Sequence, residues 1–206
     1  MHIGHLAIMK YLAGEGGFDC VYLIVSPKNP LKDGISADSG MDRYNAAVEA
    51  VKRHFPSGAG EHAGHMPRTA RGWLPEGKPG VSVMSTAPEG KVKVDDIELR
   101  MPAPHYTIRT LDALREREPE NTFTLVMGAD NLADIRRWRD YGRILKEYGA
   151  AVYPRKGFDL DMIIKDLTEE DPSFRISVMK AEMVDISSTT IRNAIAEGQD
   201  MSRWLM

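Results

Sequence analysis

The fold class is decided by residues 122–130, which read TFTLVMGAD, and by the patterns on either side of them. The apolar and β-branched run at 122–127 predicts a buried strand, and Gly-Ala-Asp at 128–130 is typical of a turn. A helical pattern over 138–148 follows the turn, and a short strand pattern over 150–153 follows that helix. Strand, helix and strand in this order indicate a β-α-β unit with parallel strands.

The same alternation extends over the rest of the chain. Further strands are expected at 20–25, 92–99 and 174–178, and further helices at 5–12, 41–54, 106–117, 160–167 and 188–196. This pattern predicts an α/β fold, a doubly wound parallel sheet with helices on both faces. In such folds, ligands bind beyond the carboxyl ends of the strands, where loops lead into helices.

Length and composition narrow the class of protein. With 206 residues we expect a single domain over 1–206. The net charge of −3 argues against an extended nucleic-acid surface. The longest apolar run, 20–25, falls far short of the roughly 18 residues that cross a membrane. Because Cys20 is the lone cysteine and no leader pattern opens the chain, we expect a cytoplasmic protein; a homo-oligomer stays open.

One stretch of the chain departs from the alternation. Residues 56–90 hold seven glycines and five prolines, a composition that cannot easily sustain one regular element. We expect a surface insertion within the domain that is mobile and dispensable. A His-Ala-Gly-His run at 62–65 lies inside it, but no helix pattern follows and too few ligands accompany it for a metal site.

The first motif with chemical meaning is His2-Ile3-Gly4-His5 at the start of a helix pattern. The two imidazoles lie about one turn apart beside unpaired N–H groups at the positive end of the helix dipole. Gly4 leaves room for a phosphate to approach the backbone. These features predict an anion site. Two surface histidines near a terminus are the alternative.

The second motif is the run ISSTTIR at 186–192. Ser187 or Ser188 can cap the helix that follows, and Arg192 lies four residues after Ser188 on the same face, where it can clamp phosphate oxygens. An ordinary serine-capped helix with a surface arginine is the alternative. Taken together, the two motifs can converge on a polyphosphate, which is what nucleotidyl transfer requires.

The motifs also resemble those of a known family. His-x-Gly-His and Ile-Ser-Ser-Thr-x-Ile-Arg are typical of the nucleotidyltransferase superfamily. The segments SPKNPLK at 26–32, PHYTIRTL at 104–111 and GADNL at 128–132, which leads to Trp138, are similar to bacterial nicotinate mononucleotide adenylyltransferases. The matches run in order from residue 1 to about 205. The resemblance implies a Rossmann-like fold and adenylyl transfer from ATP to nicotinate mononucleotide, which gives deamido-NAD and pyrophosphate in NAD biosynthesis.

The resemblance also implies residue roles. Catalytic groups that contact the ATP phosphates would be His2, His5 and Arg192. ATP would further contact Gly4, Asn29, Lys32, Gly128, Asp130, Ser188 and Thr189, with Mg²⁺ shielding its β- and γ-phosphates. The mononucleotide would contact Tyr106, Thr107 and Trp138.

The residues themselves support part of this assignment. Trp138 lies in the charged run RRWR at 136–139, and an indole face is a good partner for an electron-poor pyridinium. Thr107 can cap the 106–117 helix, whose N–H groups suit a carboxylate. The alternatives are a half-buried helix anchor for Trp138 and plain N-caps for Thr107 and Asp130.

Two other functions stay open from the sequence. One is a sibling adenylyltransferase that acts on phosphopantetheine, and the other is a non-catalytic nucleotide-binding module. The second is favoured by a departure from the family, whose members carry a strand and a Gly-rich turn before the histidine motif, where this chain has only Met1. We therefore expect a gap in the sheet beside the 20–25 and 122–127 strands. We also expect an in-frame upstream extension and poor activity without it.

Overall fold

Parallel strands form the centre of the fold, in two groups. The computed structural model describes residues 3–27, 40–55, 91–181, 194 and 197–200. In that part of the chain β1 (Val21–Ile24) pairs with β2 (Val92–Asp95), and Val21 lies opposite Val92. A second sheet has the order β3 (Leu125–Gly128), β4 (Ala150–Tyr153) and β5 (Ile176–Val178). All of these pairs are parallel, as the alternation of elements predicts.

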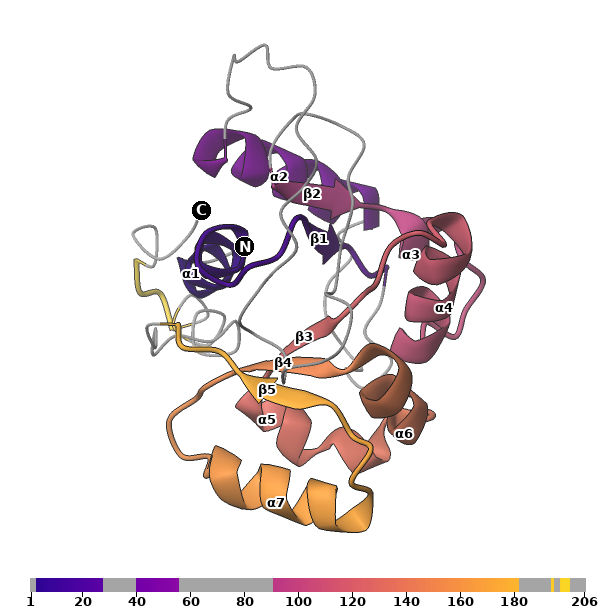
Figure 1. Cartoon of the computed structure of the whole chain (residues 1–206). Helices are drawn as coiled ribbons and strands as arrows, with labels where there is room; N and C mark the ends of the chain where they lie inside the picture. Colours follow the sequence, from indigo (N-terminus) through magenta and orange to yellow (C-terminus); the bar gives the residue numbers. More distant parts are fainter. Residues whose placement is uncertain (1–2, 28–39, 56–90, 182–193, 195–196, 201–206) are drawn as a thin grey trace.

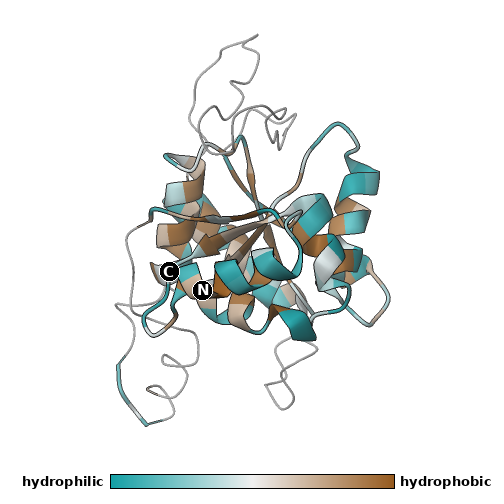
Figure 2. Ribbon diagram, turned by 60° about the horizontal axis from the view of Figure 1, so that its bottom comes forward, coloured by the Kyte–Doolittle hydropathy of each residue, from teal (hydrophilic) through white to brown (hydrophobic). Residues whose placement is uncertain are grey.

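Helical segments connect the strands. They are α1 (Ile3–Ala13), α2 (Gly40–His54), α3 (Ile97–Arg100), α4 (Thr107–Arg117), α5 (Ala129–Ala133), a 3-10 turn (Ile135–Arg137), α6 (Tyr141–Arg143), a π-helical turn (Ile144–Tyr148) and α7 (Leu160–Glu170). Figure 1 shows α2 beside the β1–β2 pair and shows α5 and α7 beside the three-stranded sheet. Figure 2 shows hydrophobic residues gathered where the strands meet the inner faces of the helices.

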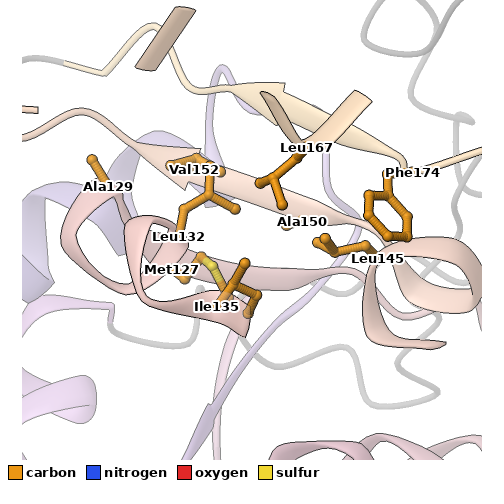
Figure 3. Packing of buried hydrophobic residues seen from close by; sticks show 9 residues of the cluster. All are labelled: Met127, Ala129, Leu132, Ile135, Leu145, Ala150, Val152, Leu167 and Phe174. Carbon is orange, nitrogen blue, oxygen red and sulfur yellow. The ribbon is translucent and has the colours of Figure 1, made fainter. Parts of the chain in front are cut away.

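The strand β4 is buried on both faces, which is why all four of its residues are apolar or aromatic. Ala150 and Val152 pack into a cluster with residues of α5, the π-helical turn and α7 (Figure 3). Ala151 and Tyr153 point to the other face and pack against Leu12 of α1. Helices therefore cover both faces of this sheet, as expected for a doubly wound fold.

The two sheets are separate within the described residues. β1 is an edge strand of the first sheet, and β3 is an edge strand of the second. These are the two strands beside which the sequence predicts a gap. All four residues of β1 are only half-buried, whereas those of β4 are fully buried. The described part of the chain contains no strand that pairs with the second edge of β1 or of β3.

Several predicted elements differ from the observed ones. The strand expected over 92–99 ends at Asp95, because the Asp95 carboxylate accepts the Ile97 N–H at 2.9 Å and turns the chain into α3. The helix expected over 138–148 is α6 followed by a π-helical turn. The helix at 188–196 and the insertion at 56–90 lie outside the described residues, apart from Ala194.

Candidate functional site

A close ionic contact lies at the carboxyl ends of β3 and β4. Asp130, in the first turn of α5, and Arg155, two residues beyond β4, approach to 2.9 Å between Oδ1 and Nε. Neither of these buried atoms has an aligned hydrogen bond, so the contact is an ion pair without hydrogen-bond geometry. The sequence predicted Asp130 as a site residue and missed Arg155, since nothing local links two residues that follow different strands.

Gly128 makes this contact possible. A Cβ at position 128 would lie 2.3 Å from Asp130 Oδ1 and 2.6 Å from Arg155 Nε, both closer than real Cβ contacts. The structure thus brings together the predicted residues Gly128 and Asp130 and adds a cation. Asp130 is not the N-cap of α5, because the cap position is Gly128, so the plain-cap alternative for Asp130 is wrong.

A shallow cavity, largely open to solvent and with a volume of about 670 Å³, lies next to α4 and α6. It is lined by Tyr106 and by residues 136–143. Tyr106 and Trp138, both predicted to contact the mononucleotide, therefore line one cavity although they lie 32 positions apart in the sequence. Trp138 is half-buried and also packs against two core clusters, so its alternative role as an anchor coexists with its place in the cavity.

The start of α4 borders this cavity. Tyr106 is its N-cap residue and Thr107 is the first helical residue, so the prediction that Thr107 caps the helix is wrong. The cap position makes no side-chain hydrogen bond. Helix N-termini without such a cap offer their N–H groups to other acceptors, carboxylates included.

Arginines give the cavity a basic rim. Arg136 is held by Glu170 at 2.8 Å, and Arg143 is held by Glu147 at 2.8 Å. Arg137 and Arg139 have looser partners and side chains that are 72% and 67% exposed. The sequence signal for these cations is the run RRWR, in which only the tryptophan was predicted to contact the substrate. Guanidinium groups so placed suit phosphate or carboxylate.

The chain reverses sharply just after Trp138. Asp140 adopts a left-handed conformation with φ of 52° and lines the cavity. Aspartate is one of the few residues other than glycine that tolerate this region. The reversal starts α6, so it places Trp138 and Arg143 on the same cavity.

The phosphate-binding motifs are described only in part. Gly4 is buried and His5 is half-buried in the first turn of α1, and both take part in interactions. The other predicted ATP contacts lie outside the described residues: His2, Asn29, Lys32, Ser188, Thr189 and Arg192. Within the described part no three His, Cys, Asp or Glu side chains form a potential metal cluster.

Two further features of the sequence can be compared with the structure. Cys20 is 3% exposed, and burial raises the pKa of its thiol to about 11, which argues against a role as a nucleophile. None of the described helices has the length and hydropathy of a membrane span.

Comparison with known proteins now assigns the family. The cytidylyltransferase-like family matches residues 82–194, more than half of the chain. A probable nicotinate-nucleotide adenylyltransferase of Flavobacterium johnsoniae is 30% identical over 201 residues, which cover 98% of this chain and 83% of that relative. The corresponding protein of Bacteroides fragilis is 32% identical over 205 residues, covering 100% and 81%. The chain belongs to the nicotinate-nucleotide adenylyltransferase family.

The solved structures agree on the fold of this family. The Plasmodium falciparum nicotinic acid mononucleotide adenylyltransferase complexed with NaAD superposes with a TM-score of 0.64. That match covers 98% of this chain and 82% of the other at 13% identity. The Rossmann-like nucleotidyltransferase fold predicted from the sequence is confirmed.

Proposed function

We propose that this protein transfers the adenylyl group of ATP to nicotinate mononucleotide, giving deamido-NAD and pyrophosphate in NAD biosynthesis. The observation that carries the proposal is the cavity that Tyr106 and Trp138 line together with a rim of arginines. An aromatic wall and cations beside a helix N-terminus suit a pyridine ring that bears a carboxylate and a phosphate. The family to which the chain belongs supports the same reaction.

At the mononucleotide end, the indole of Trp138 stacks on the pyridine ring, and Tyr106 contacts the pyridine ring from the side of α4. The carboxylate of nicotinate lies at the start of α4 and accepts from Thr107 and the backbone there. Support comes from the uncapped N-terminus of α4 and from the exposed Arg137 and Arg139. This arrangement favours the acid over the amide mononucleotide, because an amide brings no negative charge to the helix dipole.

At the adenylate end, Gly128 lets the nucleotide approach the backbone, and Asp130 accepts from a ribose hydroxyl. Arg155, paired with Asp130 in the structure, is placed to turn towards phosphate oxygens when ATP binds. His2 and His5 contact the phosphates from the start of α1, with Asn29 and Lys32 nearby. The ATP phosphates are held from the other side by Ser188, Thr189 and Arg192.

The reaction needs alignment and charge stabilisation rather than a covalent intermediate. A phosphate oxygen of the mononucleotide attacks the α-phosphorus of ATP in line. The new P–O bond forms as the bond to the β-phosphate breaks, and the charge moves to the leaving pyrophosphate. Donors such as His2, His5 and Arg192 stabilise that charge. Mg²⁺ enters as part of the substrate, bound to the phosphates of ATP.

The test is release of pyrophosphate from MgATP in the presence of nicotinate mononucleotide. We expect faster turnover with this substrate than with nicotinamide mononucleotide, and none with phosphopantetheine. Binding of ATP without pyrophosphate release would favour the non-catalytic nucleotide-binding module instead. The lone cysteine fits a reducing compartment, and we propose that the protein works in the cytoplasm.

A further inference from the structure

A buried polar pair connects α3 to α4. Glu98 is 7% exposed and Thr110 is 4% exposed, and in the described part of the chain they are the polar or charged residues that are buried. The hydroxyl of Thr110 donates to Oε1 of Glu98 at 2.6 Å. This length is typical of a hydroxyl bound to a carboxylate.

A second connection runs from α4 to the loop that follows α3. The guanidinium of Arg109 donates to the carbonyl oxygens of Pro102 at 3.2 Å and Pro104 at 2.7 Å. The Tyr106 N–H donates to the Pro104 carbonyl at 3.1 Å. The segment 101–106 is therefore clasped by Arg109 on its exposed side, while Glu98 and Thr110 join the helices that flank it.

Stability alone does not account for the buried pair. Taking a carboxylate out of water is costly, and apolar side chains of similar volume often stabilise a core equally well or better. A short, directional hydrogen bond does something that apolar packing does less well, which is to fix one relative position of two elements. Here the elements are α3, which follows β2, and α4, whose first turn borders the cavity.

We propose that Glu98 and Thr110 are positioning residues that set the place of Tyr106 and Thr107, and through them the affinity for the mononucleotide. The inference rests on the proposed function, which puts the nicotinate ring and its carboxylate at the start of α4. Neither Glu98 nor Thr110 lines the cavity, so neither contacts the substrate there. Thr110 lies three residues after Thr107, within one helical turn of it.

The decisive variants are Thr110→Val, which removes the hydroxyl at constant shape, and Thr110→Ser, which keeps it. We expect Thr110→Val to raise the KM for nicotinate mononucleotide roughly five- to tenfold, as the loss of one buried hydrogen bond implies. The KM for ATP should change less than twofold, and Thr110→Ser should resemble the unsubstituted protein. Hydrogen exchange of the amides at 106–110 should become faster in Thr110→Val and not in Thr110→Ser.

The outcomes separate this inference from the proposed function. Trp138→Ala, measured alongside, tests the function, because it must raise the KM for the mononucleotide if the ring stacks there. If it does so while Thr110→Val leaves that KM or the exchange of 106–110 unchanged, the positioning role is wrong and the function stands. Equal rises in both KM values for Thr110→Val also overturn it. Should Thr110→Val fail to fold, Glu98→Met, which removes the acceptor at similar volume, is measured in the same way, and the same selective rise in the KM for the mononucleotide is expected.

Discussion

At the scale of single residues, the contact between Asp130 and Arg155 depends on the absent side chain of Gly128. In Gly128→Ala, the new Cβ would meet both charged groups, and because both are ends of flexible side chains we expect them to move apart at little cost in stability. The KM for ATP should rise by an order of magnitude, since the ribose contact is lost. An unchanged KM for ATP, with the melting temperature as a check on folding, would show that Asp130 does not contact the nucleotide.

A second residue-scale prediction concerns Trp138. Trp138→Ala should raise the KM for nicotinate mononucleotide far more than the KM for ATP, because stacking acts in ground-state binding. Trp138 also packs against the core, so we expect the melting temperature to fall as well. Trp138→Phe keeps a ring and is the matched control, with a smaller rise. Parallel changes in both KM values would sink the assignment.

At the scale of elements, α6 begins at a left-handed residue. Asp140→Val should destabilise the protein by about 1–2 kcal/mol, because a β-branched side chain is strained at φ of 52°. It should also weaken mononucleotide binding by displacing Trp138. Asparagine and glycine tolerate this conformation, so Asp140→Asn and Asp140→Gly should retain both the stability and the mononucleotide binding. Urea unfolding and steady-state kinetics measure the two effects, and a Val variant as stable as the Asn variant would contradict the argument.

The π-helical turn is tied to α4 by ion pairs that predict an acid response. Hydrogen bonds from Arg143 and Arg115 lower the pKa of Glu147 from 4.5 to about 2. The stabilisation of the folded state by these ion pairs is therefore present above the ordinary pKa of glutamate, and it is lost as the pH falls from about 5 towards 2. Since the Glu147 side chain is 36% exposed, solvent screening keeps the effect small.

The measurement for this pair is the melting temperature between pH 6 and pH 3. In Glu147→Gln, the melting temperature should fall less steeply between pH 6 and pH 3 than it does in the unsubstituted protein. Glu169→Gln is the control, since that carboxylate lies 3.8 Å from Lys165 on an exposed helix face. If both variants decline as steeply as the unsubstituted protein, the ion pairs at Glu147 do not contribute.

At the scale of the whole molecule, the elements on either side of residues 56–90, α2 and β2, pack against each other. The helix α2 ends at His54 and β2 begins at Val92, and β2 pairs in register with β1. Because long connections between fixed ends cost little additional entropy, replacing 56–90 by a short Gly/Ser linker should preserve folding and pyrophosphate release. Loss of solubility or of an oligomer in the shortened chain, seen by size-exclusion chromatography, would show that this segment packs against the domain or a partner.

The sequence by itself determined the order of strands and helices, the parallel pairing and the family. These follow from patterns within single segments, such as the buried run before Gly128, and from motifs short enough to be recognised alone. Element ends were less predictable, because a hydrogen bond such as that from the Ile97 N–H to the Asp95 carboxylate ends a strand.

Only the tertiary structure decided which residues meet. The pairing of Asp130 with Arg155, the shared cavity of Tyr106 and Trp138, and the buried bond between Glu98 and Thr110 all join separate elements. The physical reason is that such contacts depend on how β3 and β4 align and how α3 and α4 pack, which is settled by burial over the whole chain rather than by any local pattern.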